Sequence, residues 1–188
     1  MAFSFYGIFR RNIKIIQKMK IKIALSFAIP LLILLVFFLS LNSNKNYSTK
    51  NLVGNKIEIF TINGLNKNVK TSSSELSSNN YTLINFWASW CSPCRLEHKF
   101  LILLKSSSKI KILGINFKDK KNNALAFLNE LGNPYYFSGS DIDGRISVKL
   151  GVYGIPESIL IDKDLKIIKK FIGPINNKDY REILKIIR

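Results

Sequence analysis

The sequence predicts an α/β domain with a mixed β-sheet flanked by helices, preceded by a single N-terminal transmembrane helix. In the first half of the domain, apolar runs alternate with stretches whose apolar residues recur every three or four positions, which is typical of parallel strands joined by helices. In the second half, two alternating runs flank a turn and predict an antiparallel hairpin. An uncharged apolar stretch over 23–41 predicts the transmembrane helix.

The composition fits one modest domain with an attached segment. The chain has 188 residues, of which 47% are hydrophobic, and this excludes a disordered protein and a large multidomain enzyme. The net charge is +17, but six of the 29 basic residues precede residue 23, whereas the first acid is Glu58. The positive-inside rule therefore places residues 1–22 in the cytoplasm. Lipid headgroups explain this basic flank more economically than nucleic acid does, so no nucleic-acid partner is expected.

The apolar stretch over 23–41 is expected to be an uncleaved anchor. At the rise of an α-helix it spans about 28 Å, against a hydrocarbon core of about 30 Å. A secretory signal peptide is the alternative, but its apolar part is usually about 7–15 residues long and ends at small residues, which are missing after Leu41. Residues 42–55 are rich in Asn, Ser and Lys and are expected to form a linker to a domain over 56–188.

The cysteine-containing segment is the best-defined part of the predicted domain. Residues 83–87 form a nearly continuous apolar run, as expected of a central strand that is buried on both faces. After Cys91 and Cys94, apolar residues recur at helical spacing, so we expect a helix from the cysteine pair to about residue 105. The two cysteines then lie on the first turn of that helix.

Further elements are expected on both sides of this segment. Before it, 57–60 and 68–70 are expected to pair as a hairpin around Asn63 and Gly64, while 71–80 is too polar to place. After it we expect, in chain order, a buried strand over 109–117, a helix over 124–131, a short strand over 135–137, a turn over 141–144, a short helix over 146–150, a hairpin of 157–161 and 166–171, and a helix over 180–187.

The cysteine pair is the strongest chemical signal in the sequence. Cys91 and Cys94 are the only cysteines, so a framework of several disulfides is impossible. At the start of a helix, the free N–H groups and the helix dipole favour a thiolate, which makes Cys91 the expected nucleophile. Cys94 is placed to resolve the mixed disulfide that Cys91 forms with a partner. Pro93 is tolerated in the first turn and stiffens it.

Other roles for the pair are less economical. A zinc site needs four ligands, and outside the pair the chain offers no Cys and only His98. Copper could bind through Cys91, Cys94 and His98, which are soft or borderline ligands. An inert structural disulfide would close a very short loop and remove little chain entropy. We therefore expect redox chemistry and no bound metal.

Two motifs carry a resemblance to known proteins. Residues 85–94, Asn-Phe-Trp-Ala-Ser-Trp-Cys-Ser-Pro-Cys, resemble the signature of the thioredoxin-like superfamily. Residues 151–157, Gly-Val-Tyr-Gly-Ile-Pro-Glu, resemble the fingerprint of the DsbE/CcmG family of cytochrome c biogenesis. Further segments match the pattern of that family in the same order, namely 94–98, 113–119, 132–135 and 141–145.

The resemblance implies a thioredoxin-like fold and a thiol:disulfide oxidoreductase on the periplasmic side of the bacterial inner membrane. Its substrate would be the haem-attachment cysteines of apocytochrome c, reduced directly or through a CcmH-like dithiol partner. Electrons would come from a membrane thiol reductase of the DsbD/CcdA kind. No cofactor is implied beyond the redox-active Cys91–Cys94 disulfide. A monomer is expected, because the single domain shows no dimerisation segment.

The resemblance also implies a substrate surface beside the cysteines. The Ile155–Pro156 bond is expected to be cis, in a loop that offers its backbone to an extended peptide. Tyr153 and Glu157 flank this loop and are interpreted as contacts at the edge of the substrate, with ordinary packing as the alternative for Tyr153. The expected substrate-binding residues are Trp90, Pro93, Tyr153, Ile155 and Pro156.

One position departs from thioredoxin. The buried acid that helps thioredoxin deprotonate its resolving cysteine falls at Asn85, and an amide cannot exchange a proton in this way. Glu97 is our first candidate for the missing acid, because it lies one helical turn after Cys94 and matches an acid of similar reductases. Glu157 is the second candidate, and a solvated Glu97 on the helix surface is the alternative. We expect His98 on the helix surface or as a cap.

Two other functions remain open. The first is a general periplasmic thiol reductase or an isomerase on the same fold, although isomerases usually form dimers. The second is a copper chaperone for an oxidase, although copper carriers of this fold tend to use a wider cysteine spacing and a distant His.

Overall fold

The computed structural model describes residues 22, 26–39, 52–65 and 69–188. The chain divides into two compact units, Met1–Tyr47 and Ser48–Arg188. In the first unit, residues 26–39 are helical. Within the described residues, no helix combines the length and the apolar character needed to cross a membrane. The anchor predicted over 23–41, the basic segment over 1–22 and the linker over 42–55 are each only partly within the described residues. These three assignments therefore stay predictions.

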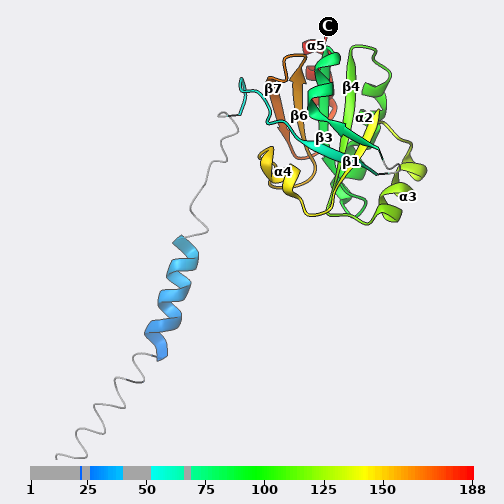
Figure 1. The fold of residues 1–188 in the computed structure, drawn as a ribbon. Coiled ribbons are helices and arrows are strands. Elements are labelled where there is room, and N and C mark those ends of the chain that lie inside the picture. The colour runs from blue at the N-terminus through cyan, green and yellow to red at the C-terminus, as the bar shows by residue number, and fades with distance from the viewer. Residues whose placement is uncertain (1–21, 23–25, 40–51, 66–68) are drawn as a thin grey trace, which may run out of the picture. The chain divides into compact units, whose positions relative to one another are not determined.

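The second unit is built on one mixed sheet, as predicted. Among the described residues, the strands of this sheet lie in the order β2-β1-β5-β4-β3-β6-β7 (Figure 1). The central strand β3 pairs in parallel with β4 and antiparallel with β6. The strand bounds are Thr61–Gly64 for β1, Lys70–Ser72 for β2, Tyr81–Trp87 for β3, Ile110–Phe117 for β4, Phe137–Asp141 for β5, Glu157–Asp162 for β6 and Ile167–Ile172 for β7.

Helices cover both faces of the sheet and divide the core in two. One hydrophobic cluster takes residues from α2, α3 and α5, and the other takes residues from η2 and the segment that follows α4. The helices are the 3-10 helix η2 at Ser73–Ser78, α2 at Ser92–Lys105, α3 at Lys121–Leu131, α4 at Arg145–Lys149 and α5 at Asn177–Ile186.

Strand β3 belongs to both halves of the core. Because successive side chains of a strand point to opposite faces, Leu83 and Trp87 pack under α2 while Ile84 and Phe86 pack on the other side. All four are essentially inaccessible to solvent. The same alternation turns Asn85 toward α2, where a buried polar side chain needs partners within the protein.

The structure corrects the predicted bounds of two elements and adds a helix in a segment for which no element was predicted. The N-terminal hairpin forms as expected, but its strands are β1 and β2, so Asn63 and Gly64 lie in a strand and not at the turn. The strand predicted over 135–137 begins only at Phe137, where pairing with β4 starts. The segment that was too polar to place contains η2, which begins with a capping box formed by Ser72 and Glu75.

Gly114 allows an aromatic ring to lie directly on the sheet. It pairs with Asn85 across β3 and β4, and a Cβ atom added to it would lie 2.7 Å from Cγ of Tyr135. The absence of a side chain at this position therefore sets how deeply the Tyr135 ring enters the core.

We predict that Gly114→Ala lowers the free energy of unfolding by about 1–3 kcal/mol, because the methyl group overpacks the Tyr135 ring. Urea denaturation would measure the loss. Gly154→Ala is the matched control, since a Cβ at Gly154 meets no atom within 4 Å. Equal stability losses in the two variants would contradict this account.

Candidate active site

The central strand leads directly to the reactive pair. Cys91 is the N-cap residue of α2, with extended backbone angles, and its sulfur accepts the N–H of Cys94 at 3.2 Å. The two cysteines form a disulfide with their Cα atoms 5.3 Å apart. Pro93 lies in the first turn and is exposed. The free N–H groups and the dipole of α2 therefore act on the Cys91 sulfur, which favours its thiolate after reduction.

An aspartate holds the turn that precedes Cys91. The carboxylate of Asp119 accepts the backbone N–H of Ser89 at 2.6 Å and its hydroxyl at 2.9 Å. The indole N–H of Trp90 donates to the carbonyl of Lys118 at 3.1 Å, and the Trp90 side chain remains 58% exposed. The loop after β4 thus fixes both residues before Cys91. Sequence reasoning assigned no role to Asp119, because its partner lies 30 positions away.

The loop before β6 ends in a cis peptide bond between Ile155 and Pro156, as the resemblance implied. Inside this loop, the Glu157 carboxylate accepts the backbone N–H groups of Tyr153 at 3.3 Å and Gly154 at 3.2 Å. Glu157 is buried, whereas the Tyr153 side chain is 73% exposed. Glu157 therefore fixes the shape of the loop, and its role as a proton acceptor stays a prediction.

A buried lysine completes this loop. The ammonium group of Lys170 lies 2.6 Å from a Glu157 carboxylate oxygen and donates to the carbonyl of Gly151 at 2.5 Å. It also lies 5.8 Å from the centre of the Tyr153 ring. Lys170 sits in an alternating strand, where a lysine normally faces solvent, so its sequence position gave no sign of this role.

Strand register brings the two loops to one edge of the sheet. Phe86 near the end of β3 pairs with Glu157 at the start of β6. The turn that carries Trp90 and Cys91 and the loop that carries Ile155 and Pro156 therefore leave the sheet side by side. This is the arrangement that the predicted substrate surface requires.

Glu97 lies on the buried face of α2, three residues after Cys94, and is only 1% exposed. This rules out the alternative of a solvated surface residue. One carboxylate oxygen accepts the amide N–H of Asn85 at 2.8 Å, and the other accepts the backbone N–H of Ile175 at 2.8 Å. Burial dominates over these hydrogen bonds and raises the pKa of Glu97 to about 7.

The predicted surface position of His98 was wrong, whereas the alternative of a capping role fits its contact with Gly132, the C-cap residue of α3. The ring is 4% exposed and lies between α2 and α3, with Nε2 2.8 Å from the carbonyl oxygen of Gly132 and its plane edge-on to Phe127. Burial lowers the pKa of His98, which fits a neutral ring that donates its Nε2 hydrogen to this carbonyl. No group of three or more His, Cys, Asp or Glu residues suited to a metal ion occurs in the part of the chain that the structure describes.

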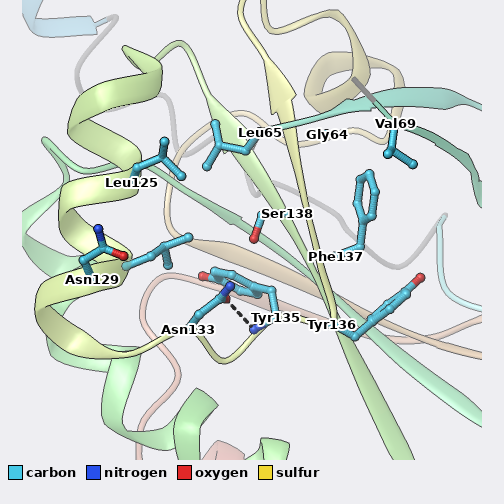
Figure 2. Close-up of a pocket in the computed structure, with 11 residues that line it drawn as sticks. Gly64, Leu65, Val69, Leu125, Asn129, Asn133, Tyr135, Tyr136, Phe137 and Ser138 are labelled. Atoms are coloured by element: carbon cyan, nitrogen blue, oxygen red, sulfur yellow. Dashed lines mark hydrogen bonds between the residues drawn. The ribbon is translucent and has the colours of Figure 1, made fainter. Parts of the chain in front are cut away.

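A separate pocket of about 430 Å³ lies between α3 and the N-terminal hairpin. Figure 2 shows Tyr135 on the α3 side of the strand and Tyr136 turned the other way, with Leu65 and Leu125 nearby. Neither cysteine lines this pocket. Its lining is mostly apolar and amide side chains, so it offers no redox chemistry of its own.

Comparison with known proteins assigns the family. The Redoxin family matches residues 52–185. DsbE of Escherichia coli, a thiol:disulfide interchange protein, is 38% identical over 135 residues, which cover 71% of this chain and 72% of that protein. The chain belongs to the DsbE family of thiol:disulfide interchange proteins. The family chemistry is that of an oxidoreductase, and the Cys91–Cys94 pair has the spacing it requires.

Other DsbE relatives differ in how much they align. The thiol:disulfide interchange protein CycY of Rhizobium leguminosarum is 48% identical over 101 residues, which are 54% of each protein, so the chain matches about half the length of this relative. A crystal structure of a candidate DsbE from Chlorobium tepidum superposes with a TM-score of 0.63 at 24% identity, covering 72% of this chain and 98% of that one. At this identity the superposition shows the thioredoxin-like fold alone.

The raised pKa of Glu97 predicts a pH-dependent stability. Because the folded protein holds this proton up to about pH 7 and the unfolded chain releases it near 4.5, stability falls as the pH rises between these values. Relative to Glu97→Gln, the oxidised protein should therefore lose roughly 1–3 kcal/mol between pH 5 and pH 8. Urea unfolding of both proteins would measure this, and a pH-independent difference would contradict the burial of a titrating carboxyl.

Proposed function

We propose that the chain is a membrane-anchored periplasmic reductant that keeps the haem-attachment cysteines of apocytochrome c as thiols. Its substrate is the disulfide of these cysteines, reached directly or through a CcmH-like dithiol partner. A membrane thiol reductase of the DsbD/CcdA kind supplies the electrons. The apolar stretch over 23–41 anchors the chain in the inner membrane, with residues 1–22 in the cytoplasm and the catalytic domain in the periplasm.

The observation that carries this proposal is the buried carboxyl of Glu97 behind the cysteine pair. A reductant must open the substrate disulfide and then release the product quickly, before the mixed disulfide is lost to side reactions. The second step needs Cys94 as a thiolate, although Cys94 is only 2% exposed in the disulfide form and an apolar environment disfavours a thiolate charge. An acceptor with a pKa of about 7 on the same face of α2 suits that deprotonation at neutral pH.

The proposed reaction proceeds in two exchange steps. The Cys91 thiolate attacks one sulfur of the substrate disulfide, which forms a mixed disulfide and releases the other substrate sulfur as a thiolate. Glu97 takes the proton of the Cys94 thiol, and the Cys94 thiolate attacks the Cys91 sulfur. The second substrate sulfur leaves as a thiolate, and both substrate thiolates take protons from solvent. Two electrons have passed from the cysteine pair to the substrate.

The surface around the pair is suited to an extended peptide. Trp90 and Tyr153 present large exposed side chains on the two loops that flank the cysteines. An extended segment lying against Ile155 and Pro156 would be held by main-chain contacts, with weak sequence preference. The haem-attachment motif Cys-x-x-Cys-His is a short peptide segment whose sulfurs must be free before haem is attached. An extended segment that carries this motif therefore fits the proposed surface.

We expect Cys94→Ser to trap a mixed disulfide through Cys91 with an oxidised Cys-x-x-Cys-His peptide, because no thiol remains to resolve it. Mass spectrometry of the reaction under non-reducing conditions would detect the adduct. Cys91→Ser is the control and should form little adduct, because Cys94 lies within the first turn of α2 and lacks the N-cap position that favours a thiolate.

Competition between disulfides tests the substrate assignment. The wild-type protein in its reduced form should reduce the disulfide of the Cys-x-x-Cys-His peptide at least several-fold faster than that of a control peptide. The control peptide has a scrambled sequence and a disulfide that closes a loop of the same length. Equal rates would favour a general thiol reductase, and catalysed exchange between non-native disulfides would favour an isomerase.

A further inference from the structure

Four polar side chains form a network inside the apolar core beneath the cysteine pair. Strands β3 and β6, helix α2 and the segment that precedes β5 each supply one of them. Each side chain is no more than 5% exposed. Such a network is stable in a core only when its hydrogen bonds are complete. Its members are Asn85, Glu97, Tyr135 and Ser158.

The hydrogen bonds of Asn85 determine which way its amide faces. The Nδ2 group donates to Glu97 at 2.8 Å and to the hydroxyl oxygen of Ser158 at 3.0 Å, which uses both of its hydrogens. The Oδ1 atom lies 2.8 Å from the Tyr135 hydroxyl. An amide oxygen only accepts, so Tyr135 must donate here. Burial, together with the charge of Glu97, raises the pKa of Tyr135 well above its ordinary value, so the hydroxyl keeps the hydrogen it donates.

Without this hydroxyl, the amide of Asn85 could turn over. The Asn85 oxygen would then take the place of the Nδ2 group and lie about as close to the Glu97 carboxyl as Nδ2 does now, at 2.8 Å. Two acceptors at that separation repel unless one of them carries a hydrogen, so the turned amide would favour protonated Glu97. The observed orientation favours the carboxylate, which is the form that can take a proton.

We propose that Tyr135 is a positioning residue for the proton transfer from Cys94, because its hydroxyl holds the Asn85 amide with an N–H toward Glu97. This inference rests on the proposed role of Glu97 as the proton acceptor. The step itself is the one already given: the Cys94 proton passes to the Glu97 carboxylate, and the Cys94 thiolate attacks the mixed disulfide. Tyr135 neither gives nor takes a proton in it.

Tyr135 is held firmly enough to perform this task. Its ring stacks on Trp87 with ring centres 5.5 Å apart and rests on Gly114, which has no side chain to displace it. Its backbone N–H donates to the side chain of Asn133 at 3.0 Å, the bond drawn as a dashed line in Figure 2. The neighbouring Tyr136 is 46% exposed and points away from Tyr135 in Figure 2, so the chain supplies a matched control at the next position.

The test follows the Cys94 step directly. The purified full-length chain, in its reduced form, reacts with Ellman's reagent in two steps, each of which releases one coloured thiolate. The first release reports attack by Cys91, and the second reports attack by Cys94 on the mixed disulfide. The rate of the second release is measured from pH 5 to pH 9 for the wild type, Tyr135→Phe, Tyr136→Phe and Glu97→Gln.

We expect Tyr135→Phe to shift the pH profile of the second release upward by about half a pH unit, which is about a twofold loss of rate at pH 7 and about a threefold loss well below pH 7. The profile of Tyr136→Phe should coincide with that of the wild type. Asn85→Ala removes the donor itself and should shift the profile in the same direction, which provides a second variant if Tyr135→Phe folds poorly.

The outcomes separate this inference from the proposed function. If Glu97→Gln changes the profile but Tyr135→Phe and Asn85→Ala do not, the positioning role is overturned and the role of Glu97 stands. If Glu97→Gln also leaves the profile unchanged, both assignments fall. If Tyr135→Phe only lowers the free energy of unfolding, the hydroxyl serves packing alone and the inference is overturned.

Discussion

The structure depends most on the position of Cys91 as the N-cap residue of α2. The sulfur accepts an N–H group of the first turn, so the helix itself favours the thiolate that starts the reaction. That position requires a rigid support, and β3 supplies it from the middle of the sheet, buried on both faces. Asp119 adds a second support, since it holds the turn between β3 and Cys91 through two hydrogen bonds to Ser89. The nucleophile is thus preorganised by the fold.

In the proposed mechanism, the second half of the reaction depends on the buried carboxyl of Glu97, whose charged form is costly to bury. Thioredoxin carries its acid on the central strand, whereas here that position holds Asn85, and the proposed acid is Glu97 on the facing helix. Asn85 now supports the acid, because its amide donates to Glu97 and is itself oriented by Tyr135. Burial raises the pKa of Glu97 to about 7, near the pH at which a general base works best. The loop before β6 uses another buried acid, Glu157, to fix its shape.

Sequence reasoning recovered what local patterns encode. The order of strands and helices, the central place of the strand at 83–87 and the location of the cysteine pair followed from periodicity and turn signals. It failed where tertiary pairing decides the outcome. His98 lies in an interface between two helices, and the buried partner of Glu157 is Lys170, a residue type that normally lies at the surface. No helix was predicted after Ser72, although Ser72 and Glu75 have the spacing of a capping box. The segment is so polar that it shows no apolar periodicity.

The proposed function is that of a dedicated reductant, and the reduction potential of the cysteine pair tests this proposal most directly. The compact unit Ser48–Arg188 would be equilibrated in dithiothreitol buffers, with Cys91→Ser as the control that cannot form the disulfide. The account predicts a potential near or below that of thioredoxin, about −270 mV, which allows the pair to open a substrate disulfide. A potential near −120 mV, that of a strong oxidant, would contradict it.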